Sequence, residues 1–262
     1  MEAGPAIYAL AVFAGLIAGV INTLAGSGSL ITLGTLMAMG LPAPIANGTN
    51  RVGVLIQSGV ALVTMRSASI SRGDGLAWLV GAASVGALLG AWCAAVIDAQ
   101  ALEWIIIAVF WAMLVLLLIN PRKWLREESV DGAGRPSPWR VLLMALVGVW
   151  GGFLQAGVGI LLLAALVLVV GKDLIEATFI KLVVVLVYTV GTLLIFVVYD
   201  QIHWEIGLVM GIGQGAGGWI GGRFISRAPR APIWIRRLLI VVIVAVCLEL
   251  MGVSRWLISL AG

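Results

Sequence analysis

Two basic residues, Arg51 and Lys181, stand in otherwise apolar stretches of this 262-residue sequence, with few acidic residues near them. An ionisable side chain at membrane depth costs a few kcal/mol or more, so such residues are usually kept for a function. A guanidinium can hold a sulfonate or a sulfite-like oxyanion through several N–H groups, and an ammonium adds a second positive charge. The chemistry that these two residues suggest is therefore anion binding.

Polar clusters suggest further contacts to the same anion. Arg51 follows a run rich in asparagine and threonine, 47–50. Earlier in the chain, Asn22 precedes Gly26-Ser27-Gly28-Ser29, whose backbone N–H groups could face an anion at the start of a short helix. The candidate substrate-binding residues are Asn22, Gly26, Ser27, Gly28, Asn47, Thr49, Asn50, Arg51, Gln57, Gln155, Gly157, Gly159, Thr178, Lys181 and Tyr188.

Each of these assignments has a simpler alternative. The glycines could only allow close packing, and Asn47 and Thr49 could cap a helix that begins near the membrane surface. Arg51 and Lys181 could extend their charged ends to the surface instead of pointing inward. The weaker candidates, such as Gln57, could bridge helices rather than contact a substrate.

The composition excludes an ordinary soluble domain. Hydrophobic residues make up 62% of the chain and charged residues only 11%, so most of its surface should face lipid. The net charge of +4 could suggest nucleic acid, but the basic residues cluster beside apolar segments, where they are typical topology signals. His203 is the only histidine and no Cys/His cluster occurs, so we expect no metal site and no cofactor.

Apolar segments are arranged in two matching halves. They run roughly over 5–24, 28–41, 44–65, 75–97 and 101–120 in the first half, and over 141–156, 158–171, 175–199, 204–225 and 233–253 in the second. The stretch 121–140 is rich in charge, glycine and proline, which indicates a linker. We predict an all-α polytopic membrane protein with a first transmembrane repeat (1–120), a cytoplasmic linker (121–140) and a second transmembrane repeat (141–262).

The halves have the features of inverted repeats. Gly15 and Gly19 correspond to Gly148 and Gly152 at a spacing of about 130 residues. Basic loop residues follow the third segment in the first half (loop 66–72) but the fourth segment in the second half. Because cytoplasmic loops carry the excess of Lys and Arg, this reversal predicts opposite orientations for the two halves. The N-terminus should then lie outside and the linker in the cytoplasm.

The second segment of each half is too short to span a membrane. About fourteen residues reach about 21 Å as a helix, against a hydrocarbon core of about 30 Å. We therefore predict that the first two segments of each half form a broken or re-entrant pair, with breaks at 22–29 and 155–159. Paired breaks that line a cavity are typical of transport sites. Inverted repeats would bring Arg51 and Lys181 toward one midplane site from opposite faces.

The patterns Gly15-xxx-Gly19-xx-Asn22, Gly26-Ser27-Gly28-Ser29 and Asn47-Gly48-Thr49-Asn50-Arg51 resemble the TauE/SafE sulfite exporter family, also called the toluene-sulfonate uptake permease group. The second-half pattern Gly148-xxx-Gly152-xx-Gln155 and the later Lys181 look similar, and the resemblance covers essentially the whole chain. It implies a bacterial inner-membrane carrier of sulfur-containing oxyanions or related organic anions. Because 177–180 lacks the asparagine-rich context that precedes Arg51, the site should be asymmetric.

From these features we expect a secondary transporter, not an enzyme, that moves sulfite or an organosulfonate by alternating access. Its partners would be this small anion and the lipid bilayer, and no nucleic acid. Two alternatives stay open, an intramembrane enzyme with a Ser27/Lys181 site and a non-transporting membrane scaffold. The runs Gly86-xxx-Gly90 and Gly217-xxx-Gly221 could pack within the monomer or across a homodimer. We expect internal packing, in which these two runs could meet.

Overall fold

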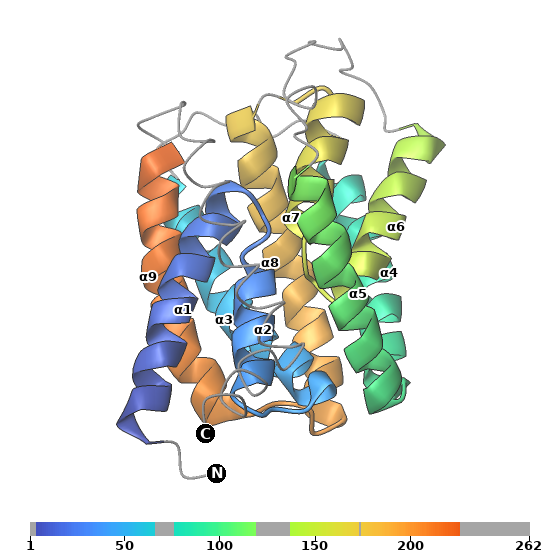
Figure 1. The fold of residues 1–262 in the computed structure, drawn as a ribbon. Coiled ribbons are helices and arrows are strands. Elements are labelled where there is room, and N and C mark those ends of the chain that lie inside the picture. The colour runs from blue at the N-terminus through green and yellow to red at the C-terminus, as the bar shows by residue number, and fades with distance from the viewer. Residues whose placement is uncertain (1–3, 66–75, 119–136, 173, 226–262) are drawn as a thin grey trace.

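The computed structural model describes residues 4–65, 76–118, 137–172 and 174–225, and the elements in these ranges are helical (Figure 1). They are α1 (Pro5–Leu24), α2 (Ser29–Ala38), α3 (Ala43–Met65), α4 (Leu76–Val96), α5 (Ala99–Leu118), α6 (Pro138–Phe153), α7 (Val158–Ala164), the π-helical turn η2 (Ala165–Val169), α8 (Leu174–Val198) and α9 (Trp204–Ile225). They confirm the expected all-α class and the expected segments to within a few residues. The segment at 233–253, most of the linker and the loop 66–72 lie outside the described residues.

Three of these helices are long and apolar enough to cross a membrane: α1, α4 and Ile175–Val198 of α8. α3 and α9 are of similar length, with 23 and 22 residues. Their lower hydropathy follows from composition, because α3 contains the polar run 47–51 and α9 is rich in glycine. The polar run of α3 is buried against other helices, so the low hydropathy does not expose polar groups to lipid.

In each half, the second helix begins beside the first helix. α2 begins beside α1, where the backbone of Gly28 lies against Ala18 and Asn22, and Figure 1 shows α1 and α2 running in opposite directions. In the second half, α7 begins beside the end of α6, where Val158 lies against Gly151. α2 has ten residues, which reach only about 15 Å. Both predicted breaks are therefore confirmed, while a re-entrant path of the first pair through the membrane stays a prediction.

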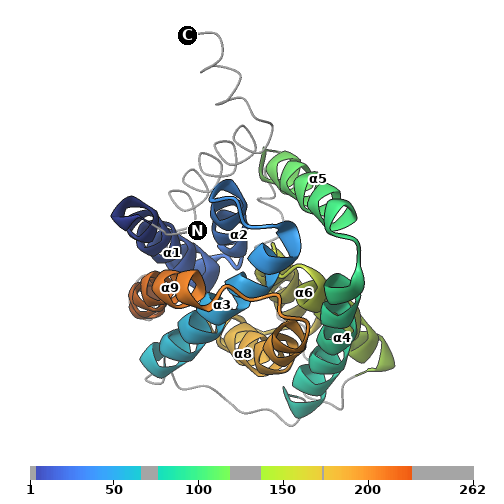
Figure 2. The same ribbon diagram turned by 90° about the horizontal axis from the view of Figure 1, so that it is seen from below.

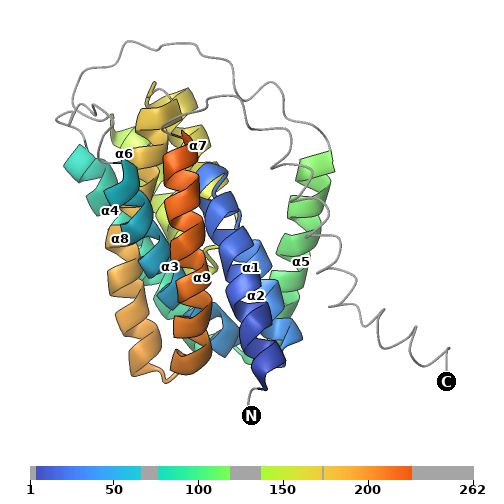
Figure 3. The same cartoon turned by 90° about the vertical axis from the view of Figure 1, so that its left-hand side faces the viewer.

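Glycine allows α1 and α9 to pack closely (Figure 3). The backbone at Gly15 and Gly19 lies against Met210 and Gln214, and the backbone at Gly217 lies against Leu16. A Cβ at any of the three glycines would overlap backbone atoms of the partner helix. Between helices in a membrane no hydrophobic effect drives association, because lipid is as apolar as the side chains. Close backbone contacts of this kind hold such helices together by van der Waals packing.

The pair α4 and α6 repeats this arrangement. Gly86 and Gly90 lie against Ala145 and Val149 of α6, and Gly148 lies in turn against α4. The first helix of each half therefore packs on the fourth helix of the other half. Both small-xxx-small runs pack within the monomer, as expected, but the expectation that they meet is wrong, since one run contacts α6 and the other α1.

The helices α3 and α8 lie between these two pairs (Figure 2). They run in opposite directions, since Arg51 near the start of α3 contacts Thr192 toward the end of α8, whereas Ser58 further along α3 lines the same cavity as Lys181. The helices α3 and α8 thus carry Arg51 and Lys181, and they place these residues beside the breaks that follow α6 and α1.

Candidate functional site

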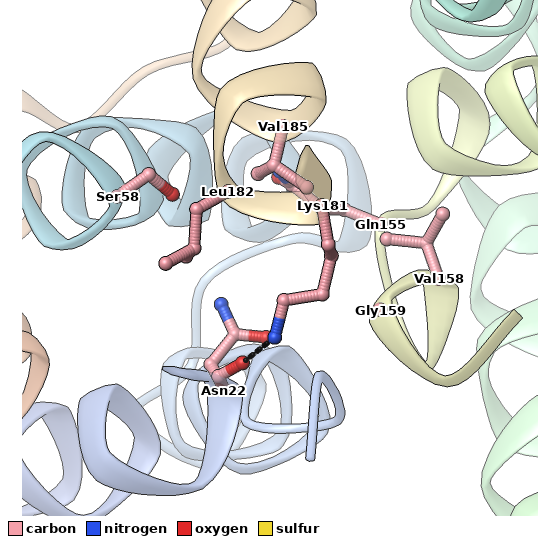
Figure 4. Close-up of a pocket in the computed structure, with 8 residues that line it drawn as sticks. All are labelled: Asn22, Ser58, Gln155, Val158, Gly159, Lys181, Leu182 and Val185. Atoms are coloured by element: carbon pink, nitrogen blue, oxygen red, sulfur yellow. Dashed lines mark hydrogen bonds between the residues drawn. The ribbon is translucent and has the colours of Figure 1, made fainter. Parts of the chain in front are cut away.

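Lys181 binds the end of the first broken helix. Its side chain is 1% exposed, and its Nζ donates to the backbone oxygens of Asn22 at 3.0 Å and Thr23 at 2.8 Å (Figure 4). Both carbonyls belong to the last turn of α1, where a helix leaves acceptors without intrahelical partners and carries a partial negative charge. The ammonium therefore acts as a C-terminal cap at the break.

Arg51 does the same at the end of α6. Its side chain is fully buried, and two of its nitrogens donate to the backbone oxygens of Gly151 at 2.9 Å and Gly152 at 2.5 Å. The guanidinium also donates to Thr192 Oγ1 at 3.4 Å and lies 5.0 Å from the centre of the Phe196 ring. This forked geometry is one that a guanidinium provides and an ammonium does not.

Asn47, one turn before Arg51 on α3, completes this cap. Its Nδ2 donates to the backbone oxygen of Phe153 at 2.8 Å. The N–H of Leu154 donates to the oxygen of Trp150 at 3.0 Å. With the two bonds from Arg51, the last four carbonyls of α6 all have partners, which a buried helix end requires.

The two cations occupy equivalent places in the fold. Each lies on the third helix of one half and caps the first helix of the other half. Both point inward, and the alternative in which they extend to the membrane surface is wrong, because they are 0% and 1% exposed. The expectation that they converge on one site is not met, since Arg51 contacts Thr192, eleven residues beyond Lys181 on α8, or about 16 Å along the helix.

Neither Arg51 nor Lys181 forms an ion pair with an acidic residue of the described ranges. In the part of the chain that the structure describes, the one ion pair joins Lys172 and Glu176 at 2.6 Å, around the start of α8. Carbonyl oxygens and the negative ends of helix dipoles offset part of the free energy of burying a positive charge. Among the described residues, no carboxylate adds a full negative charge beside Arg51 or Lys181.

The two breaks touch each other through a pair of glycines. The N–H of Gly159 donates to the oxygen of Gly26 at 3.0 Å, and a Cβ on either residue would overlap the backbone of the other. Gly26 and Gly157 have φ of 79° and 70°, in the left-handed region that favours glycine. The N–H of Gly26 is bonded to Ile21 and Asn22. Gly26 and Gly159 therefore serve close backbone packing here, which was the simpler alternative.

A small cavity lies between the two breaks, α3 and α8 (Figure 4). Its volume is about 10 Å³, which is room for about one water molecule. Arg51 is not part of its wall. The lining residues are Asn22, Ser58, Gln155, Val158, Gly159, Lys181, Leu182 and Val185. Four of the predicted residues, Asn22, Gln155, Gly159 and Lys181, thus meet at one cavity.

Hydrogen bonds tie the side-chain amide at each break to the third helix of the same half. Asn22 Nδ2 donates to Gln57 Oε1 at 2.6 Å, and Gln57 Nε2 donates to Thr23 Oγ1 at 2.9 Å. In the second half, Gln155 Nε2 donates to Thr189 Oγ1 at 3.1 Å. Gln57 therefore supports the cavity from behind Asn22, and the structure does not place it on the wall.

The polar run before Arg51 holds neighbouring elements. Thr32 Oγ1 donates to Asn50 Oδ1 at 2.5 Å and links α2 to α3. Thr49 Oγ1 accepts from the N–H of His203 at 2.9 Å and links α3 to the loop before α9. Asn47 and Thr49 lie inside α3, so the alternative that they cap its start is wrong.

The remaining predicted residues lie outside the cavity wall. Thr178 and Tyr188 are buried on α8, and Gly28 approaches α1 at the first break. Ser27 is buried, and its Oγ has no hydrogen-bond partner within the described ranges. No hydrogen bond joins Ser27 to Lys181 there, as the nucleophile and base of an intramembrane enzyme would require.

Ser58 is the polar lining residue that reasoning from the sequence missed. It is fully buried on α3, and its Oγ has no hydrogen-bond partner among the residues described. A signal was available, because Ser58 follows Arg51 by seven residues, or two helical turns, and so lies on the same face of α3. Thr23 and Thr192, which bond Gln57 and Arg51, were also missed.

Comparison with known proteins gives a consistent result. Residues 11–250 match the family described as Sulfite exporter TauE/SafE. The "Probable membrane transporter protein ORF9" of Sinorhizobium sp is 28% identical over 242 residues, which cover 91% of this chain and 90% of that protein. The "Probable membrane transporter protein YfcA" of Escherichia coli K12 is 26% identical, covering 84% of this chain and 81% of that protein.

A "Probable membrane transporter protein" of Haemophilus influenzae is 25% identical, covering 86% of this chain and 88% of that protein. No solved structure gives a significant match. The family match covers nearly the whole chain, and the relatives are aligned over most of their own length. With its apolar helices and paired breaks, this chain is a membrane transporter protein that belongs to the TauE/SafE sulfite exporter family.

Proposed function

We propose that this chain is a secondary transporter that moves a small sulfur-containing oxyanion, sulfite or an organosulfonate, across the bacterial inner membrane. The observation that carries the proposal is a pair of buried cations without carboxylate partners in the described ranges, one of which lines a cavity between two helix breaks. Buried positive charge is costly unless it is compensated. A bound anion compensates it at Lys181, and the family's description as sulfite exporters supports the sulfur oxyanion class.

The proposed mechanism is alternating access between two inverted repeats, residues 1–120 and 141–262, joined by a cytoplasmic linker at 121–140. The exchanged contacts support it, since α3 caps α6 through Arg51 while α8 caps α1 through Lys181. The pairs α1–α9 and α4–α6 are also exchanged between the halves. A relative movement of the halves would then expose the cavity first to one side of the membrane and then to the other.

The described form would be a closed state in this cycle. A sulfur oxyanion has at least four heavy atoms, and a cavity of about 10 Å³ holds about one water molecule. Anion binding therefore requires the cavity to widen. Lys181 couples the two events, because an anion that accepts the free N–H of its ammonium also weakens the attraction of that ammonium to the oxygens of Asn22 and Thr23. Weakening this cap loosens the end of α1 and lets the break move.

The test is uptake of radiolabelled sulfite into proteoliposomes that contain the full chain. We expect uptake above that of protein-free liposomes, and its loss in Lys181→Gln, which keeps a hydrogen-bond donor but removes the charge. Tyr8→Phe, on the exposed side of α1, serves as the matched control and should transport like wild type. Wild-type uptake equal to that of empty liposomes would refute sulfite as the substrate. Undiminished uptake by Lys181→Gln would refute the site.

A further inference from the structure

We propose that the cavity beside Lys181 is selective for a singly charged oxyanion and that Ser58 is the second side chain that donates to it. This inference deepens the proposed function and rests on it for the role of the site. It concerns which charge state the cavity accepts and which residue besides Lys181 recognises the anion.

The charge of the wall sets the charge of the ligand. Lys181 is the one ionisable residue among those that line the cavity. Arg51 cannot add a second charge, because its guanidinium bonds Gly151 and Gly152 and lies near Thr192, about 16 Å along α8 from Lys181. A dianion would bring one negative charge into the protein without a partner, and an unpaired buried charge is strongly unfavourable. One ammonium matches one negative charge.

Ser58 provides an unused donor on the same wall. Its side chain is fully buried, and its Oγ has no hydrogen-bond partner within the described part of the chain. Figure 4 shows Ser58 on the opposite side of the view from Gln155, with Leu182 and Lys181 between them. Buried hydroxyls in native structures nearly always have a partner. An anion oxygen in the widened cavity would give Ser58 that partner and would also accept the third N–H of Lys181, whose other two are bonded to Asn22 and Thr23.

The rest of the wall favours an uncharged substituent. Val158, Leu182 and Val185 face the cavity and offer no hydrogen bond. A further charged oxygen pressed against them would lose its hydration without replacement, whereas a methyl group or a single proton would not. The cavity therefore suits an anion with its oxygens toward Lys181 and Ser58 and a neutral group toward the valines and the leucine.

A comparison of methanesulfonate with sulfate tests whether the cavity prefers a singly charged anion. Both have a tetrahedral sulfur, and they differ by a methyl group in place of one charged oxygen. We would titrate each, as its sodium salt at matched ionic strength, into the purified full chain in detergent and follow the midpoint of thermal unfolding. We expect methanesulfonate to bind at least about tenfold more tightly than sulfate, because the sulfate complex keeps one uncompensated charge.

Three variants assign the residues. Ser58→Ala should weaken methanesulfonate binding about tenfold, the effect of one hydrogen bond to a charged group, and Lys181→Gln should abolish it. Ser84→Ala is the matched control, since Ser84 Oγ on α4 also has no hydrogen-bond partner among the described residues but is not on the wall. Its affinity should equal that of wild type.

Three results would overturn the proposal or one of its parts. Sulfate binding as tight as that of methanesulfonate would refute the charge selectivity. Failure of both anions to bind would refute the site. An unchanged affinity in Ser58→Ala would refute the role of that residue. If methanesulfonate binds selectively but proteoliposomes show no sulfite flux, this inference holds and only the proposed transport of sulfite is refuted.

Discussion

The contact between the two breaks can be tested by adding a single methyl group at Gly159. An added Cβ there would overlap the Cα of Gly26 and lie 2.6 Å from its oxygen and 2.8 Å from its carbonyl carbon, so the two backbones must separate by about 1.5 Å to restore ordinary van der Waals distances. That movement breaks the hydrogen bond from Gly159 to Gly26, now 3.0 Å long. Overpacking costs about 1–3 kcal/mol and the hydrogen bond about 0.5–1.5 kcal/mol. The sum predicts a loss of about 1.5–4.5 kcal/mol for Gly159→Ala.

The assay is thermal unfolding of the purified chain in detergent, with uptake in proteoliposomes beside it. At about 2–4 °C per kcal/mol for a chain of this size, the midpoint should fall by roughly 3–18 °C. Gly81→Ala is the control, because a Cβ at Gly81 meets nothing within 4 Å and the helix-propensity gain is similar at both sites. Gly159→Ala with the midpoint and the flux of wild type would refute the tight contact between the breaks.

Three further substitutions test the caps and the networks around the cavity. Arg51→Lys should lower the free energy of unfolding by about 1–3 kcal/mol, since an ammonium cannot reproduce the fork to two carbonyls; an unchanged melting midpoint would contradict the cap. Gln57→Leu removes the acceptor of Asn22 and should cost about 1–3 kcal/mol and reduce flux, and wild-type values for both would argue against the network. Tyr8→Phe removes an exposed hydrogen bond to Glu205 and should leave the melting midpoint in place, so a marked fall would show that α1 and α9 depend on it.

The broken helices could be predicted from the sequence because their signals are local. Glycine and polar residues interrupt apolar runs at 22–29 and 155–159, and the following segments are too short to span a membrane. The burial of Arg51 and Lys181 could also be predicted from local context. Each lies in an apolar stretch that should pack inside the membrane, and few acidic residues lie near it in the sequence. Both are at most 1% exposed in the structure.

The partners of these cations could not be predicted in the same way. Arg51 binds carbonyls one hundred residues away on α6, and any residue type can supply a carbonyl. The close contact of Gly26 with Gly159 is equally non-local, so the same glycines could be interpreted as an anion-binding turn. Ser58 lay within reach of sequence reasoning through its spacing from Arg51, but a lone serine in an apolar helix is a weak signal.

The measurement that tests the central claim most directly is sulfite counterflow in proteoliposomes. Vesicles loaded with unlabelled sulfite would be diluted into a trace of radiolabelled sulfite, with protein-free vesicles as the control. A carrier with one binding site that faces the two sides in turn should accumulate label transiently above equilibrium, and Lys181→Gln should abolish this overshoot. Wild-type vesicles that reach equilibrium without an overshoot, or a Lys181→Gln variant with the overshoot of wild type, would contradict transport of sulfite at the Lys181 cavity.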